Sequence, residues 1–329
     1  MKRITLADVA AHAGVSRTAA SLAVRGTGRL SEDTRRRIKA SMDELGYTYH
    51  RGAASLRTQS TSLVGLVVTD LSNPFFAEMA LGFEATLSEA DMVTIISSTR
   101  DSAARFTRLG RALLEHPVEA LVYVPVTGGP EDPFPGERTP ALAATRDPGT
   151  EVPFLGVDDR LGGYVAARHL LEVHGRRRVV YLGGPEGAGV RGLRLEGVRR
   201  AVDETDGAEL IVQVPGVTSV ASGEAIVRRY LETGHDADAV ICHSDLVAFA
   251  ACRGLRERGA RVPEDVSVVG FDGLDLGRVF DPPLTSVSAD PAGIGRRCAQ
   301  WVLASLRGED VPVRTLVEPE LIVRRSCGC

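Results

Sequence analysis

Apolar residues recur at helical spacing in the first 47 positions of the chain, and their period changes near residue 60. One apolar stripe of a first short helix is formed by Leu6, Val9, Ala10 and Ala13. Gly14 then permits a tight turn, Ser16 can cap a second short helix, and a third is predicted between Ser31 and Gly46. Two short helices joined by a glycine turn and supported by a third predict a helix-turn-helix, whose second helix reads the major groove of DNA. The alternative is a helical scaffold with no role in nucleic-acid binding.

From residue 60 onward, apolar runs typical of buried strands alternate with helical patterns. Strands are predicted at residues 63–68, 93–97, 120–124, 154–157, 179–182, 210–214, 239–242 and 266–271, with an element of unassigned type at 141–145 and a closing strand pair within 314–324. Helices are predicted at residues 73–89, 103–115, 162–173, 193–203, 222–231, 247–258 and 291–306. This alternation predicts an α/β core of doubly wound parallel sheets, arranged as two similar lobes with a ligand cleft at the carboxyl ends of the strands.

Charge is distributed unevenly between these two parts. Residues 1–60 hold eleven Lys and Arg against five acidic residues, a net +6, so the other 269 residues carry −10 of the whole-chain charge of −4. A basic head on an acidic body is expected when one end of a protein meets phosphate and the other does not.

Composition argues against a membrane protein and a secreted one. No stretch approaches about 18 apolar residues, and no apolar signal segment follows the first residues, so we expect a cytoplasmic protein without a membrane partner. The five cysteines form no even disulfide framework. Cys327-Gly328-Cys329 could bind a soft metal, but no His or Cys lies nearby in the sequence, so an ordinary frayed tail is expected.

Enzymatic machinery is not visible. The seven histidines show no catalytic or metal-ligand spacing, so we expect no enzyme, no metal and no cofactor. Residues 187–192 fit G-x-G-x-x-G, but Pro185-Glu186 separates them from the preceding strand, whereas a dinucleotide site has its first glycine directly after the strand. A nucleotide-dependent enzyme therefore remains a weak alternative, which NAD binding would revive.

Seven motifs in order along the chain together carry a family resemblance. They are Thr5-Leu6-Ala7-Asp8-Val9-Ala10, Ala13-Gly14-Val15-Ser16, Leu45-Gly46-Tyr47, Ser55-Leu56, Asn73-Pro74-Phe75-Phe76, Val268-Val269-Gly270-Phe271-Asp272 and Leu321-Ile322-Val323-Arg324. On these motifs the chain resembles the lactose-repressor/galactose-repressor (LacI/GalR) regulators. The resemblance implies a homodimer, a core like a two-lobed periplasmic binding protein with three crossovers, and a hinge helix that folds on operator DNA.

We therefore expect three parts. Residues 1–48 form the all-α DNA-binding head, 49–60 the hinge helix and linker, and 61–329 the effector-binding and dimerisation core. Within the core, the first lobe is expected at residues 61–157 and 289–317, and the second at 158–288 and 318–329. Five residues follow Arg324 without leucine heptads, which favours a dimer over a tetramer.

The resemblance also assigns residues to DNA recognition. Arg17 and Thr18 open the second helix, whose start reaches base edges, and Arg17 is suited to a bidentate guanine contact or else to a phosphate. Leu22 stands where relatives commonly carry a base-reading Arg, so it either touches a thymine methyl or belongs to the core. The expected major-groove set is Ser16, Arg17, Thr18, Ser21, Leu22 and Arg25, and the expected minor-groove hinge residues are Ala53 and Leu56, with Leu56 as the wedge that kinks the operator.

A second set is expected to bind the effector by the same resemblance: Phe75, Phe76, Arg146, Arg194, Ser244 and Asp272. Arg194 and Asp272 would hold hydroxyls or a carboxylate through charge-assisted hydrogen bonds, and Phe75 and Phe76 would form an apolar wall. Other readings stay open, because Asp272 could cap a helix, Phe76 could belong to the core, and Arg194 could form a surface ion pair.

The sequence thus predicts a dimeric, ligand-responsive repressor that binds a palindromic operator and a small molecule, a sugar or related metabolite. Two alternatives remain: the same regulator answering to a protein corepressor, or a solute-binding protein without a DNA role, which the basic head opposes.

Overall fold

The computed structural model describes residues 4–24, 28–47, 61–116, 118–130, 139–217 and 219–329. The chain divides into two compact units, Met1–Thr61 and Ser62–Cys329. In the described parts of the chain, no helix is long and apolar enough to cross a membrane.

The first unit contains the three predicted helices, α1 (Leu6–His12), α2 (Arg17–Val24) and α3 (Glu32–Leu45). A capping box fixes the start of α1: Asp8 N donates to the Thr5 hydroxyl, and Thr5 N donates to Asp8 Oδ2 at 2.8 Å. Gly46 ends α3 in the left-handed region with φ 62°, which suits a residue without a Cβ. Val9, Ala13 and Ile38 form the buried centre of this small unit.

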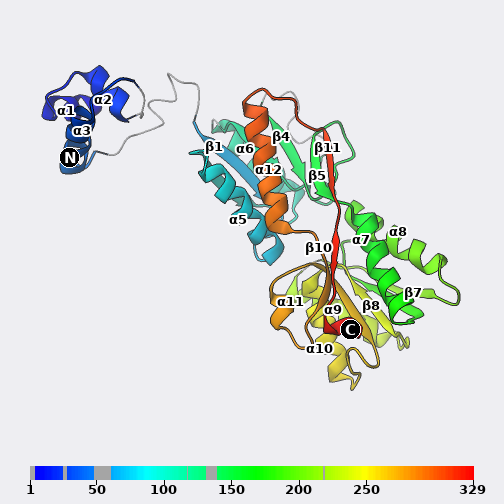
Figure 1. The fold of residues 1–329 in the computed structure, drawn as a ribbon. Helices are drawn as coiled ribbons and strands as arrows, with labels where there is room; N and C mark the ends of the chain where they lie inside the picture. The colour runs from blue at the N-terminus through cyan, green and yellow to red at the C-terminus, as the bar shows by residue number, and fades with distance from the viewer. Residues whose placement is uncertain (1–3, 25–27, 48–60, 117, 131–138, 218) are drawn as a thin grey trace. The chain divides into compact units, whose positions relative to one another are not determined.

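The second unit contains two six-stranded sheets (Figure 1). The first sheet has the order β11-β5-β4-β3-β1-β2, and all its pairs are parallel. Its strands are β1 (Leu63–Val68), β2 (Val93–Ser98), β3 (Ala120–Tyr123), β4 (Ala141–Ala144), β5 (Phe154–Val157) and β11 (Arg314–Val317). The second sheet has the order β12-β10-β9-β8-β6-β7, with only β12 antiparallel to its neighbour. Its strands are β6 (Arg178–Leu182), β7 (Glu209–Val214), β8 (Ala239–Cys242), β9 (Ser267–Asp272), β10 (Thr285–Ser288) and β12 (Glu320–Ile322).

Helices cover both sheets, and each sheet with its helices is called a lobe below. The first lobe holds α5 (Pro74–Ser88), α6 (Ala103–Glu115) and α12 (Pro291–Leu306). The second holds α7 (Asp159–Arg168), a π-turn (His169–Val173), α8 (Gly189–Asp203), α9 (Val220–Glu232), α10 (Asp245–Glu257) and α11 (Leu276–Val279). Figure 1 shows α5 beside α12 in one lobe and α7 beside α8 in the other. The predicted fold class, a helical head followed by two doubly wound α/β lobes, is confirmed.

Two glycines let α7 and α8 approach closely. A Cβ at Gly163 would overlap the carbonyl oxygen of Arg194, and one at Gly197 would overlap that of Arg160. These two contacts fix the spacing between the helices, and so the distance from Arg194 on α8 to the start of α7.

Two predictions about the C-terminal part were wrong. The two strands expected within residues 314–324 are present, but they do not pair with each other, because β11 joins the first sheet and β12 the second. The two residues between them, Glu318 and Pro319, carry the chain from one lobe to the other. The end of the chain is not a frayed tail: Cys327 is buried, and its carbonyl accepts a hydrogen bond from the Ser267 hydroxyl at 2.7 Å.

Candidate functional site

A cleft of about 710 Å³ opens at the carboxyl ends of strands from both sheets. Asp70 follows β1, Arg100 follows β2 and Arg146 follows β4, while Ser244 follows β8 and Asp272 ends β9. This is the edge where doubly wound sheets bind ligands, and the volume falls in the range of small-molecule sites. The structure brings all six predicted effector residues to the cleft wall.

Arg194 is held in place by contacts with other residues of the second lobe. Its Nε donates to Asp159 Oδ1 at 2.7 Å, and its Nη1 donates to the carbonyl of His243 at 2.5 Å. The central carbon of the guanidinium also lies over Phe271, 3.4 Å from the ring centre. The surface ion pair considered from the sequence is wrong, since only 12% of the Arg194 side chain and 4% of Asp159 is exposed. Of the five N–H groups of this guanidinium, the bonds to described residues use two, so donors remain for a ligand.

Asp272 presents an unsatisfied acceptor. Its Oδ2 is buried and, among the described residues, has no hydrogen-bond partner. Burial, together with the neighbouring Asp245 carboxylate, raises the pKa of Asp272 well above its usual value. Its backbone has φ 123°, which L-residues rarely adopt and which proteins tolerate chiefly at functional sites. The helix-capping role considered for Asp272 is wrong, because the residue is the last of β9.

A second carboxylate lies beneath Asp272. Asp245 accepts from the Ser286 hydroxyl at 2.6 Å and from the backbone N of Leu274 at 2.8 Å. Burial raises the pKa of Asp245 to about 7, although both hydrogen bonds act in the opposite direction. These bonds fix the loop that follows β9 and so hold Asp272 at the cleft.

Arg146 belongs to the first lobe and has its own acidic partner. Its Nη1 lies 2.6 Å from Asp101 Oδ1 and 3.2 Å from the carbonyl of Pro125. The hydroxyl and backbone N of Thr127 also donate to Asp101. The first lobe thus presents a braced Arg–Asp pair to the cleft, opposite Arg194 and Asp272 of the second.

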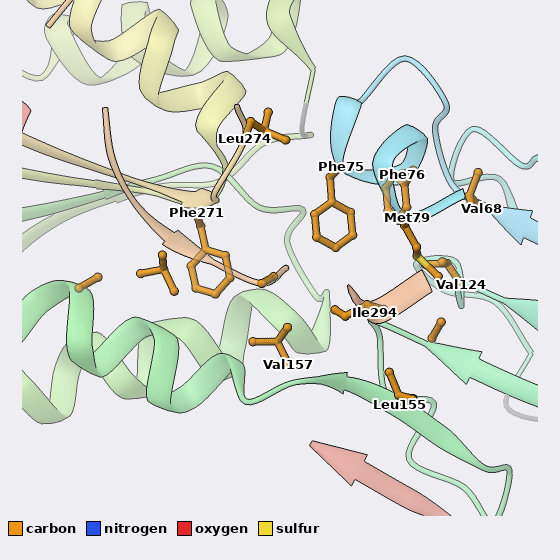
Figure 2. Packing of buried hydrophobic residues seen from close by; sticks show 14 of the residues in the cluster. Val68, Phe75, Phe76, Met79, Val124, Leu155, Val157, Phe271, Leu274 and Ile294 are labelled. Carbon is orange, nitrogen blue, oxygen red and sulfur yellow. The ribbon is translucent and has the colours of Figure 1, made fainter. Parts of the chain in front are cut away.

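The two phenylalanines differ in their surroundings. Asn73 caps α5 by accepting from Phe75 N at 3.1 Å, which places both rings at the start of the helix. The rings meet edge to face, with centres 5.2 Å apart. Figure 2 shows Met79 of the same helix pointing into the first lobe toward Val124, whereas the Phe75 ring projects away from that lobe. Phe76 lines the cleft and is also part of the buried cluster, so both of its predicted readings apply.

Ser244 caps α10, since its hydroxyl accepts from Val247 N. The preceding His243 is buried, and its Nδ1 lies 2.8 Å from the Tyr181 hydroxyl. Burial, and then the charges of Arg194 and Arg146, lower the pKa of His243 well below its usual value. His243 is therefore an uncharged residue that lines the cleft and positions Arg194 through its carbonyl.

In the head, the start of α2 is open to solvent. Ser16 caps this helix by accepting from Ala19 N at 3.1 Å, and the side chains of Arg17 and Thr18 are exposed. Ser21 and Leu22 are half-buried. A Cβ at Gly28 would lie 3.0 Å from both methyl carbons of Leu22, so Leu22 packs against Gly28. Three further predicted DNA contacts, Arg25, Ala53 and Leu56, lie outside the described residues.

Comparison with known proteins assigns the chain to a family. Residues 5–49 match the model of the bacterial regulatory proteins of the lacI family, and residues 167–327 match a periplasmic binding protein-like domain. The HTH-type transcriptional regulator CelR of Thermobifida fusca is 35% identical over 99% of this chain and 98% of its own length. The chain belongs to the LacI family. It is a helix-turn-helix transcriptional regulator and not an enzyme.

Solved structures of LacI-family proteins agree with this assignment. A complex of the regulator CelR with cellobiose is 34% identical, with a TM-score of 0.73, and covers 98% of this chain and 100% of that one. The lac repressor dimer bound to operator and the anti-inducer ONPF is 25% identical, with a TM-score of 0.88, and covers 99% of each chain.

Two supports of the LacI-family cleft were missed by sequence reasoning. Asp159 and His243 both contact Arg194, yet neither stands in a motif that points to a ligand. Their place within two residues of the end of a predicted strand was a signal, but many residues share it. The G-x-G-x-x-G segment has a different use: Gly189 begins α8, and the nearby Ala188 and Val190 line the cleft.

Proposed function

We propose that this chain is a repressor whose affinity for its operator is set by a carbohydrate, or a similar polyhydroxyl metabolite, bound between the lobes. The observation that carries the proposal is the buried Oδ2 of Asp272, which has no hydrogen-bond partner among the described residues, together with the spare donors of Arg194. A sugar hydroxyl can donate to a carboxylate and accept from a guanidinium at the same time. The similarity to CelR, which is known in complex with cellobiose, supports this ligand class.

The walls of the cleft fit the same chemistry. Its polar side chains alternate in sign, with Arg146 beside Asp101 in the first lobe and Arg194 near Asp272 in the second. Phe75 offers an apolar face to the ring carbons of a sugar. Because both lobes contribute polar groups, a bound ligand stabilises one angle between them over others.

In the head, we propose that Ser16, Arg17, Thr18, Ser21, Leu22 and Arg25 face the major groove, and that Ala53 and Leu56 of a hinge helix enter the minor groove. The similarity to a lac repressor dimer bound to operator supports a homodimer on a palindromic site. The lobe angle would then determine whether two hinge segments can fold together on the DNA.

The test begins with selection of genomic fragments by the purified full-length protein at fixed, near-physiological salt. One enriched palindrome is expected. Operator affinity is then measured by fluorescence anisotropy against a panel of mono- and disaccharides and of metabolites from genes beside the palindrome. A response to none of them, with operator binding intact, would favour a protein corepressor. No enrichment over random DNA would contradict the repressor itself.

Asp272→Asn tests the cleft directly. It retains the size of the side chain but removes a carboxylate, and a lost hydrogen bond to a charged group costs about 1.5–3 kcal/mol, a roughly tenfold to hundredfold loss of ligand affinity. Asp275→Asn is the matched control, because Asp275 lies three residues away with 89% of its side chain exposed and outside the cleft. Equal ligand affinity in both variants would show that Asp272 does not contact the effector.

A further inference from the structure

Four side chains with metal-binding atoms meet in the second lobe, away from the cleft. They are His169, His174, Cys327 and Cys329, and one ligand atom of each lies within 4.8 Å of all the others. None of the four lines the cleft described above. The first cysteine is buried, the histidines are half-buried and the last cysteine is exposed.

The two histidines are adjacent because of an irregularity in the helix. The segment His169–Val173 at the end of α7 is a single turn of π-helix, in which backbone hydrogen bonds join residues five positions apart. Residues five apart, such as His169 and His174, therefore lie on the same side, and their Nε2 atoms are 3.2 Å apart. In a regular α-helix five residues turn through about 500°, which would leave the two side chains about 140° apart around the helix axis.

The two cysteines are brought to the same point by the last residues of the chain. Gly328 between them has φ 115°, and a Cβ there would lie 3.0 Å from His174 Nδ1. Glycine thus permits both the backbone conformation and the close approach to the imidazole. Cys327 is further fixed by Thr285, whose Oγ1 lies 3.1 Å from its Sγ.

Four of the six separations between the ligand atoms lie close to those of a tetrahedral zinc site. With Zn–S near 2.3 Å and Zn–N near 2.05 Å, tetrahedral geometry gives N–N and S–N edges of about 3.3 and 3.6 Å. The His169–His174 pair is at 3.2 Å, Cys327 Sγ lies 3.4 Å from His169 Nε2, and Cys329 Sγ lies 3.4 and 3.9 Å from His174 and His169 Nε2. Two neutral nitrogens and two sulfurs, with no carboxylate, select Zn²⁺ over the oxygen-binding Mg²⁺ and Ca²⁺.

We propose that His169, His174, Cys327 and Cys329 bind one Zn²⁺ ion in a closed, structural site. All four tetrahedral positions are protein ligands, which leaves none for a substrate or water. The ion would join the helical segment that follows the first crossover between lobes to the residues that follow the third. His169 and Cys327 are 158 positions apart, so the ion would close a long loop of the chain that runs through both lobes.

The test uses the full-length protein without a histidine tag, kept reduced, stripped of metal with a chelator and titrated with Co²⁺. We expect about one Co²⁺ per chain, with the visible bands of tetrahedral cobalt and a thiolate-to-cobalt charge-transfer band, both lost when Zn²⁺ is added. Zn²⁺ should also raise the melting temperature of the stripped protein, because it binds the folded state alone.

Cys329→Ser and His174→Asn each remove one ligand that is exposed or half-buried. Neither changes the buried Cys327, whose replacement could disturb the fold. Each should weaken Co²⁺ binding more than about 100-fold, since even the loss of an outer partner of a ligand costs 10–100-fold. His235→Asn is the control, because His235 is an exposed histidine of the same lobe outside the cluster. The proposal is overturned if the wild type gives no thiolate band, or if Cys329→Ser and His174→Asn both bind Co²⁺ as the wild type does. It is also overturned if Cys327 and Cys329 form a disulfide that persists under the reducing conditions.

Discussion

Replacing Arg194 with Ala should destabilise the core of this regulator by several kilocalories per mole. The change leaves the Asp159 carboxylate, 4% exposed, without its cation and removes the guanidinium from the face of Phe271. Breaking a buried ion pair by removing one partner costs about 3–5 kcal/mol. Burial already raises the pKa of Asp159, so in the variant this group can take up a proton, which limits the loss. The lower end, about 3 kcal/mol, is therefore expected.

Urea unfolding of the full-length protein, followed by circular dichroism, measures this loss. Arg160→Ala is a matched control on the same pair of helices, because Arg160 and its partner Glu196 are 56% and 53% exposed and an exposed pair contributes at most about 1 kcal/mol. Adding Asp159→Asn to Arg194→Ala should recover part of the stability, since no unpaired carboxylate remains, and a coupling of about 0.5–3 kcal/mol is expected. A loss no larger than in the control, or strictly additive single variants, would refute the reasoning.

Further predictions concern the carboxylates, the helix contact and the head. The folded-state pKa of Asp245, about 7, lies above its ordinary value of 3.8. Its contribution to stability is thus full below about pH 4 and lost as the pH rises through about 7. Asp245→Asn should therefore flatten the decline in unfolding free energy between about pH 4 and pH 7, and parallel profiles would contradict this. Gly163→Ala should cost about 1–3 kcal/mol in urea unfolding by forcing α7 and α8 apart, whereas Gly192→Ala, with no atom within 4 Å of the added carbon, should not destabilise. Leu56→Ala should keep the fold but weaken operator binding strongly in a salt-matched titration, and unchanged binding would defeat the hinge interpretation. Arg17→Ala should lose about 1–3 kcal/mol of discrimination at one base pair, measured against operators altered at single positions.

The strands were the most predictable part of the fold. An unbroken apolar run such as Leu63–Val68 is buried on both faces of a parallel sheet, so its limits in the sequence and in β1 coincide. Helix starts were less predictable: the helix expected from residue 162 begins at Asp159, where Asp158 caps it, and the one expected from residue 193 begins at Gly189. Polar capping residues and glycines do not contribute to the periodic pattern of apolar residues. The pattern alone therefore places the start of each helix at its first apolar turn, which comes after the true start.

The cleft and the metal cluster differ in what a sequence can reveal. Several cleft residues, such as Arg146, Ser244 and Asp272, stand at or just after strand ends, and parallel topology brings all such positions to one edge once the fold class is known. The cluster instead depends on a π-turn at His169 and on the packing of Cys327 against the second sheet, and neither leaves a local pattern. Sequence distance therefore argued against a partner for the cysteines, although the fold places two histidines beside them.

The support of Arg194 also explains how a ligand in the proposed site would act on the lobe angle. Asp159, which binds Arg194, follows Val157 at the end of β5 by two residues, so it stands directly where the chain leaves the first sheet. Because Gly163 and Gly197 hold α7 and α8 in close contact, Arg194 cannot move far without moving the start of α7 at this crossover. A ligand that draws Arg194 toward the Arg146–Asp101 pair would thus act on the crossover through one short hydrogen bond, whereas a ligand bound to the second lobe alone would not. Contact with both arginines, rather than affinity as such, is what should distinguish an effector from a molecule that merely binds.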